Sequence, residues 1–245
     1  GTAVVQGLVE TGALVASEHG WVVEPEAMGA AQASRRAATL LTRRLQQLTA
    51  STRRALVAGA VLGRSFEIEV AAALVGCDLR TAHLAFADAR ERQIVWPDED
   101  GLTCTFVHDR LRETLLAGLS DDERRGLHHL AALALRGLAQ AAGKTAVEAT
   151  RASMFDIAYH HDAAGEHALA LPFALEAAEL ARARSDFETA TRYYRIAARG
   201  AGEDAAATRR ISEALGDLAL IGGRYDEAAT HLASAAAAAE SRLEQ

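Results

Sequence analysis

The apolar pattern of the second half of the chain constrains the fold more than any other feature. From residue 109 onward, alanine and leucine recur every three or four residues, which is the period of an α-helix, and no strand-like alternation interrupts them. Proline is scarce, with 3 residues among 245, and aromatic residues make up 5%, so little would break helices or fill a β-rich core. We therefore expect a mainly α-helical protein.

Three capping boxes sharpen this prediction. In a capping box, a Ser or Thr side chain and a Glu three residues later satisfy amides that the first helical turn leaves unpaired. The pairs are Ser120 with Glu123, Thr145 with Glu148, and Ser185 with Glu188. Together with the period, they predict helices at about 109–118, 121–141, 146–163, 166–183, 186–199, 205–221 and 224–240.

The first residues of the chain predict a different organisation. Residues 2–11 have the pattern of a short helix, and residues 14–23 that of a hairpin closing an upstream domain. Residues 24–37 are typical of a linker that becomes helical. Because the chain begins at Gly1 inside an amphipathic pattern, we expect it to be part of a longer protein.

Four helices are expected between this linker and residue 93. Ser51 is predicted to cap the second, which ends at Gly63. The third spans about 67–75, and Asp78 begins the fourth. The residues expected to face inward are Leu41, Leu45 and Leu48 in the first helix and Leu79, Ala82, Phe86 and Ala89 in the fourth.

The apolar period then changes from helical to strand-like. Residues 94–96 and 103–107 have the pattern of strands, and the Pro-Asp-Glu-Asp-Gly sequence at 97–101 is a turn. These segments predict a β-hairpin. Helices followed by a hairpin are typical of a winged-helix arrangement.

Two helix pairs near the C-terminus share one spacing of small and bulky residues. The positions are Ala178, Ala181, Phe187, Ala190, Tyr194 and Ala197 in one pair and Gly216, Ala219, Tyr225, Ala228, Leu232 and Ala235 in the other. Small residues let two helices cross closely, and bulky ones fill the groove to the next helix. The pattern resembles the tetratricopeptide repeat, without its tryptophan and proline. An ordinary helical bundle is the alternative, and either arrangement suits a protein or peptide partner.

The junction between the predicted hairpin and the next helix resembles a known motif. Its sequence is Phe106-Val107-His108-Asp109-Arg110-Leu111-Arg112-Glu113. It is similar to the Met-His-Asp motif of signal-transduction ATPases of the nucleotide-switch (STAND) class, which include bacterial maltose-regulator-like and LuxR-type large transcriptional activators and plant immune receptors. Val107 stands at the Met position. Further segments that resemble the winged-helix domain of the bacterial regulators are Leu45-x-x-Leu48, residues 55–63 with Phe66, and Arg124-x-x-x-His128.

In that family the motif histidine contacts the phosphate of bound ADP and helps to hold the closed, inactive state. The resemblance therefore implies an ADP phosphate-sensing role for His108. An imidazole at an interdomain seam can donate to a phosphate, and losing that contact would favour the open form. The structural alternative is a histidine that hydrogen-bonds to the backbone. Asp109, in turn, is a candidate cap for the helix that follows.

These patterns divide the chain into three parts. Residues 1–28 end an upstream lid or ATPase-associated domain, residues 29–120 form a winged-helix-like domain with a small β-hairpin, and residues 121–245 form an array of tetratricopeptide-like α–α repeats. The predicted fold class is mainly α.

The charge of the chain argues against binding to nucleic acid or to an acidic membrane surface. The formal net charge is -7, and both surfaces would repel it. Arginines on the fourth helix could face DNA, but carboxylates surround them and the hairpin turn carries Asp98, Glu99 and Asp100, so phosphates would meet the wrong sign. We expect no direct nucleic-acid contact from this segment.

The sequence also predicts a cytoplasmic protein. No apolar run approaches the roughly 20 residues needed to cross a bilayer. Cys77 and Cys104 are the only cysteines and form no CxxC pair, so a reducing compartment fits.

Histidine pairs invite a metal hypothesis, which the geometry of a helix disfavours. The residues are His128, His129, His160 and His161, with Asp162 and His167 nearby. Adjacent helical residues point about 100° apart, so neither pair can easily present both rings to one ion. We interpret them as cationic imidazoles near helix C-termini and expect no metal site.

Catalytic motifs are lacking from the sequence. A phosphate-binding loop, G-x-x-x-x-G-K-[ST], does not occur, and the nearest stretch, residues 59–65, has the wrong spacing and no lysine. No nucleophile stands at a spacing that indicates an adjacent base. We expect no enzyme activity and no cofactor in this chain, with ATP or ADP implied for an upstream domain.

The resulting hypothesis is a regulatory and protein-interaction segment of an ATP-dependent signalling or transcriptional regulator. Its expected partners are the upstream ATPase domain and a protein or small-molecule effector on the repeats. A freestanding repeat adaptor without any nucleotide role is the alternative, and an enzyme with an unrecognised site is a third class.

Overall fold

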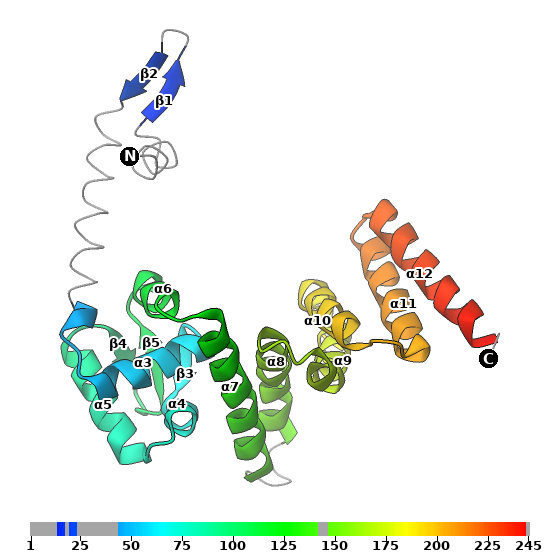
Figure 1. The fold of residues 1–245 in the computed structure, drawn as a ribbon. Coiled ribbons are helices and arrows are strands. Elements are labelled where there is room, and N and C mark those ends of the chain that lie inside the picture. The colour runs from blue at the N-terminus through cyan, green and yellow to red at the C-terminus, as the bar shows by residue number, and fades with distance from the viewer. Residues whose placement is uncertain (1–13, 18–19, 24–43, 142–146, 244–245) are drawn as a thin grey trace.

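The computed structural model describes residues 14–17, 20–23, 44–141 and 147–243. Within them the protein is mainly α-helical and carries a small three-stranded antiparallel sheet, as predicted in outline (Figure 1). The predicted helix at 2–11, the linker at 24–37 and the capping residue Thr145 lie outside the described residues. The antiparallel pairing predicted for 14–23 is confirmed, because β1 (Leu14–Ser17) pairs with β2 (Gly20–Val23).

Residues 50–117 form a first unit in which helices surround the three-stranded sheet. Its sheet has the order β3-β5-β4, with both neighbouring pairs antiparallel. The predicted hairpin is therefore confirmed. The elements in chain order are α3 (Ala50–Leu62), β3 (Ser65–Glu67), α4 (Ile68–Val75), α5 (Leu79–Glu91), β4 (Val95–Pro97), β5 (Thr103–Phe106) and α6 (Asp109–Ala117).

The helix boundaries of the first unit follow local hydrogen bonds. Asp78 caps α5 by accepting from the Thr81 amide at 2.9 Å, as predicted. Ser51, by contrast, is not the cap of α3. The helix begins at Ala50 and its cap is Thr49, whose hydroxyl accepts from the Thr52 amide at 3.1 Å.

Three phenylalanines from separate elements form the centre of the first core. Phe66 of β3 packs against Phe86 of α5 and Phe106 of β5, with ring centroids 5.2 and 5.5 Å apart. A Cβ on Gly59 would lie 2.5 Å from the Phe66 ring, so the stretch 59–65 serves packing. Leu79, expected to face inward, is 46% exposed because it begins α5 at the surface.

Residues 121–243 form a succession of antiparallel helices, here called the helical array. The observed bounds agree closely with the predicted ones. The helices are α7 (Asp121–Ala141), α8 (Val147–Ala163), α9 (His167–Ala183), α10 (Phe187–Gly200), α11 (Ala205–Ile221) and α12 (Tyr225–Leu243). The closest packing joins α9 to α10 and α11 to α12.

Of the capping boxes, the one at Ser120 is confirmed and the one at Ser185 is wrong. The Ser120 amide donates to Glu123 at 2.8 Å, and the Glu123 amide donates to the Ser120 hydroxyl at 3.2 Å. Ser185 instead adopts a left-handed conformation (φ 61°) in the turn before α10. Asp186 caps that helix by accepting from the Thr189 amide at 3.1 Å.

The small residues predicted at the helix crossings are buried. A Cβ on Gly216 of α11 would lie 2.8 Å from the Leu232 side chain of α12, so the two helices cross closely there. The bulky positions divide: Tyr194 is fully buried, whereas Phe187 and Tyr225 are 38% and 71% exposed. The two exposed rings, which were expected to fill the groove to the next helix, stand at the first residues of α10 and α12.

None of the described helices is by itself long and apolar enough to cross a membrane. The bent pair α4 and α5, set at 111° to each other, meets the length and composition of a span only when both are taken together.

Candidate functional site

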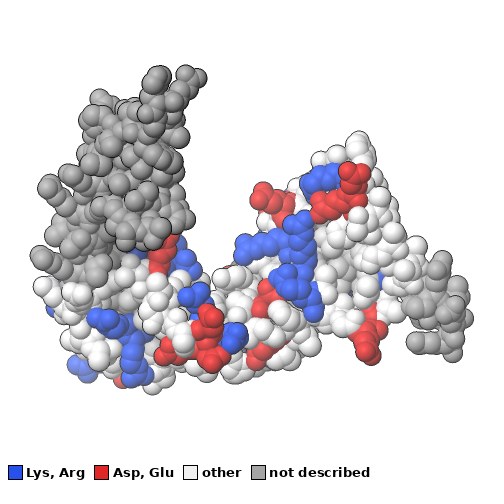
Figure 2. Space-filling view, turned by 45° about the horizontal axis from the view of Figure 1, so that its top comes forward, with Lys and Arg blue, Asp and Glu red and all other residues white. Residues whose placement is uncertain are grey.

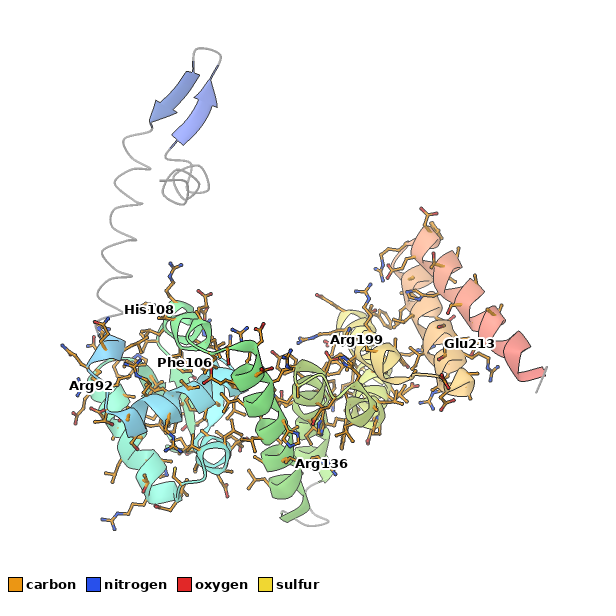
Figure 3. All side chains as sticks on the ribbon, in the orientation of Figure 1. Arg92, Phe106, His108, Arg136, Arg199 and Glu213 are labelled. Carbon is orange, nitrogen blue, oxygen red and sulfur yellow. The ribbon has the colours of Figure 1, made fainter. Side chains whose placement is uncertain are left out.

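His108 lies at the junction of β5 and α6, at the outer end of the first unit (Figure 3). It is exposed, and its ring makes no hydrogen bond to any residue that the structure describes. Among the described residues, no backbone group hydrogen-bonds to the His108 ring, which was the structural alternative.

The neighbours of His108 fix the start of α6 without using its ring. His108 itself occupies the N-cap position, so Asp109 is the first helical residue and not the cap that was expected. Asp109 lies 3.5 Å from the Arg64 guanidinium. Arg112, one turn later, donates to the Ala60 carbonyl of α3 at 2.8 Å and ties α6 to the first core.

The turn between β4 and β5 is acidic and internally bonded. Asp98 accepts from the amides of Leu102 and Thr103 at 3.0 and 3.2 Å. At the C-terminal end of α5, the cap residue Arg92 donates to Asp88 at 2.8 Å. The cations on this helix therefore stand among carboxylates.

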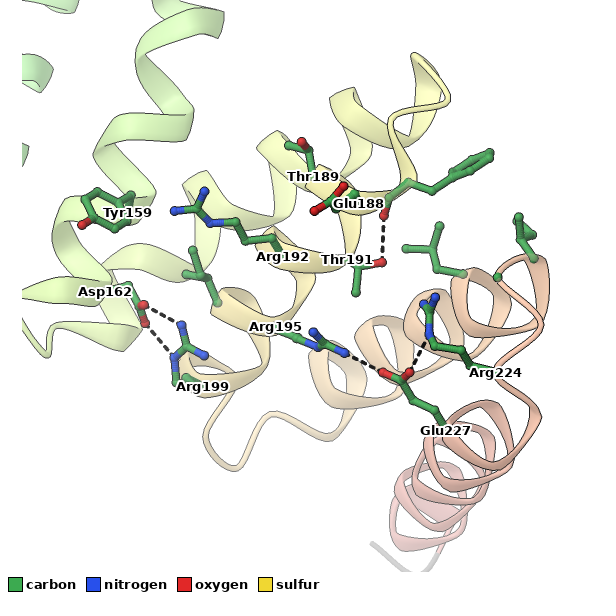
Figure 4. A pocket seen from close by; sticks show the side chains of 15 residues that line it. Tyr159, Asp162, Glu188, Thr189, Thr191, Arg192, Arg195, Arg199, Arg224 and Glu227 are labelled. Carbon is green, nitrogen blue, oxygen red and sulfur yellow. Dashed lines mark hydrogen bonds and ion pairs between the residues drawn. The ribbon is translucent and has the colours of Figure 1, made fainter. Parts of the chain in front are cut away.

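A groove of about 1020 Å³ lies in the helical array. It lies between α8, α10, the end of α11 and the start of α12, and we call it the arginine groove. Figure 2 shows arginine side chains gathered over this hollowed face, and Figure 4 shows the groove from close by. Its charged side chains are Arg192, Arg195, Arg199 and Arg224 with Asp162, Glu188 and Glu227.

Ion pairs hold most of these arginines in place. Arg199 donates from Nε to Asp162 at 2.8 Å, and a second nitrogen of the same guanidinium bonds the other carboxylate oxygen. Arg195 and Arg224 both donate to Glu227, at 2.6 and 2.7 Å. Hydrogen bonds from Arg224 and Arg195, together with their charges, keep the pKa of Glu227 below its ordinary value. Desolvation has the opposite, smaller effect on this pKa.

Arg192 differs from the other three arginines because aromatic rings hold it. Its guanidinium lies 5.6 Å from the Tyr159 ring centroid and 5.7 Å from that of Tyr193. Tyr193 is in turn fixed by donating its hydroxyl to the Phe155 carbonyl at 3.1 Å. Within the described part of the chain, Arg192 makes no ion pair.

The arginine groove was not predicted from the sequence, although the sequence contains a signal for it. Arg192, Arg195 and Arg199 stand three and four residues apart on one helix, so they share a face. Arg224 belongs to a different helix pair and contacts Glu227 locally, three residues away, whereas the approach of Arg195 to Glu227 depends on tertiary packing.

A second cluster occupies the interface of α7, α8 and α9, where two histidines are buried and neutral. His128 and His160 approach through their Nδ1 atoms at 2.8 Å. Burial, followed by the nearby His128 and His161, lowers the pKa of His160 to about 3. Burial and two arginines lower the pKa of His128 as well. The interpretation of these two residues as cationic imidazoles near helix ends is therefore wrong, since burial disfavours the charged form.

Glu166, between α8 and α9, contacts two further histidines. His129 and His161 lie with Nδ1 at 2.7 and 2.8 Å from its two oxygens. Desolvation opposes ionisation of Glu166, but these two contacts lower its pKa overall. The Nε2 atom of His161 is buried without a hydrogen-bond partner. The cluster thus connects three helices through polar contacts.

Other reactive side chains have ordinary structural surroundings. Burial raises the pKa of Cys104 to about 11, so this thiol stays protonated near neutral pH. Across the described ranges, no group of three or more His, Cys, Asp or Glu side chains could hold a metal ion.

Comparisons with protein-family models, with curated proteins and with solved structures find no match for this chain.

Proposed function

We propose that this chain is a regulatory and protein-interaction segment of an ATP-dependent signalling or transcriptional regulator. In this proposal a winged-helix-like domain senses the nucleotide held by an upstream ATPase domain, and tetratricopeptide-like repeats bind a partner or effector in the cytoplasm. The observation that carries it is the exposed ring of His108, which has no hydrogen-bond partner among the described residues and stands where β5 meets α6.

The order of elements supports the winged-helix-like part of the proposal. The chain runs α3, β3, α4, α5, β4 and β5, and the sheet order is β3-β5-β4. A helix, a short strand, two helices and a two-stranded hairpin make up a winged helix. The acidic β4–β5 turn is a reason to leave DNA out of the proposal.

Paired helices with small crossing residues support the repeat-like part. Hairpins α9–α10 and α11–α12 bury equivalent alanines, and Gly216 lets α11 approach α12. Stacked hairpins of this kind present extended surfaces to partners. The arginine groove lies on such a surface.

The proposed role of His108 is to bind ADP phosphate and so favour the closed form. A ligand contact made in only one conformation shifts the population toward it. A hydrogen bond to a charged group contributes about 1.5–3 kcal/mol. Its loss would therefore weaken ADP binding by roughly 10- to 100-fold.

The test is His108→Ala in the native protein that contains this chain. We expect faster ADP release and higher basal activity, measured by retention of labelled ADP on the purified protein. His83→Ala is the matched control, because His83 is also exposed but lies on α5. An unchanged ADP affinity in a folded His108→Ala variant would remove His108 from nucleotide sensing.

The arginine groove favours a second candidate function. A repeat adaptor needs only a partner-binding surface, and the groove supplies one without reference to a nucleotide. This adaptor would bind its partner equally well with and without ATP or ADP.

A further inference from the structure

We infer that the arginine groove binds an extended acidic peptide segment of a partner protein, with its carboxylates on Arg192, Arg195 and Arg224. The inference rests on the protein-interaction part of the proposed function and names the partner's chemistry. It does not depend on nucleotide sensing.

The carboxylates of the groove do not engage all of the hydrogen-bond donors of its guanidinium groups. Arg195 and Arg224 share the single carboxylate of Glu227, so each guanidinium keeps donors that this carboxylate does not use. Arg199, in contrast, already donates two hydrogen bonds to the two carboxylate oxygens of Asp162. The unused donors belong to two residues that line the groove, Arg195 on α10 and Arg224 directly before α12.

Arg192 is the arginine best prepared for an incoming carboxylate. Tyr159 and Tyr193 hold its guanidinium by cation–π contacts at 5.6 and 5.7 Å. These contacts leave the N–H groups of Arg192 available for hydrogen bonds. A cation–π contact is an attraction between the cation and the face of an aromatic ring, and it uses no directed hydrogen bond. A guanidinium that is already positioned loses less freedom on binding, and it can bind a carboxylate through two parallel hydrogen bonds.

The apolar rim and the size of the groove favour a peptide over a small anion. Phe187 and Ile221, both at the groove, are 38% and 59% exposed. A volume of about 1020 Å³ accommodates a chain of several residues. An apolar side chain between two acidic ones would contact this rim while its neighbours reach the arginines.

The groove's own carboxylates argue against a nucleic-acid ligand. Asp162, Glu188 and Glu227 line it together with the four arginines, so the excess of positive charge is small. A continuous phosphate backbone needs several unopposed cations. Alternating carboxylates and apolar groups fit this mixed surface better.

Fluorescence anisotropy with a labelled peptide tests the inference on the full chain. The probe is a short fluorescein-labelled peptide that alternates glutamate with leucine and ends on phenylalanine. Its comparison peptide carries glutamine in place of every glutamate. We expect the glutamate peptide to bind at least about tenfold more tightly, since charged hydrogen bonds are stronger than neutral ones.

Two charge reversals distinguish the groove from general electrostatics. Arg192→Glu should weaken binding of the glutamate peptide by about tenfold or more. Arg209→Glu, the control, changes the charge equally but lies on α11 about 13 Å along the helix axis from the groove residue Leu218, and should have little effect. Circular dichroism melting confirms that both variants fold.

Several results would overturn the inference. Equal binding of the two peptides, equal losses in the two variants, or no binding of the glutamate peptide would each exclude an acidic-peptide groove. Nucleotide sensing would be unaffected by any of these results, because ADP retention in the His108→Ala variant is measured separately.

Discussion

At the scale of single residues, buried histidines couple the helical array to pH. A hydrogen bond between the Nδ1 atoms of His128 and His160 needs one N–H and one lone pair, which two neutral rings supply. The pKa of His160 is about 3, below the ordinary value of 6.5. The unfolded chain therefore binds a proton that the folded chain rejects, and folding stability falls as the pH drops below about 6.5.

The first residue-scale prediction concerns the size of this loss. One proton contributes about 1.4 kcal/mol per pH unit, so His160 alone should lower the free energy of unfolding by about 2 kcal/mol between pH 7 and pH 5. His128 shifts in the same direction and adds to the loss. Urea unfolding followed by circular dichroism at the two pH values measures it.

The variant His160→Gln removes the titrating group and keeps a side chain that can bond His128. Its stability should vary with pH by about 2 kcal/mol less than that of the wild type. The exposed His83→Gln variant serves as the control and should keep the full wild-type dependence. If His160→Gln retained the whole wild-type loss, the buried imidazole would not be its source.

Residue roles were the least predictable part of the molecule. The positions of His128 and His160 in separate helices were correct, but their burial depends on how α7 meets α8, which no local pattern records. Likewise, Asp109 was a sound cap by sequence, yet the helix begins at Asp109 itself, one residue earlier than a cap at that position requires. Arg192 was missed because one of its two aromatic neighbours, Tyr159, comes from another helix, α8.

At the scale of elements, the predictions succeeded where the apolar period was long. Helices α7 to α12 begin and end within a few residues of their predicted bounds, since each repeats its buried face over several turns. Strand β3 was missed because it has three residues, of which only Phe66 is buried. So short a segment contains no period to detect.

The element-scale prediction concerns the crossing of α9 and α10. A Cβ on Gly200, the last residue of α10, would collide with the backbone carbonyl of His167 at the start of α9. Backbone atoms cannot move aside as a side chain would. Gly200→Ala should therefore destabilise the protein by about 1–3 kcal/mol.

Gly137→Ala on α7 is the matched control. Nothing lies within 4 Å of the position that its Cβ would occupy, and alanine has the higher helix propensity, so this variant should gain up to about 1 kcal/mol. Thermal or urea unfolding compares the two variants with the wild type. Equal stability of the two variants would mean that the α9–α10 hairpin does not pack as closely as described.

At the scale of the whole molecule, the two candidate surfaces lie in separate parts of the chain. His108 stands on the first unit, and the arginine groove lies in the helical array (Figure 3). A regulator that senses a nucleotide through one surface and a partner through the other would need both, with α7 packed against α3 and α4 to connect the two parts. The proposed acidic-peptide groove would then be the input and His108 the contact with the ATPase domain.

The measurement that tests this account most directly is the intact mass and the sequence of the native polypeptide from its source cells. The account predicts a product much larger than 25.9 kDa, with a phosphate-binding loop of the form G-x-x-x-x-G-K-[ST] upstream of the segment that contains His108. A native polypeptide near 25.9 kDa would contradict the nucleotide-sensing role and leave a repeat adaptor with its arginine groove.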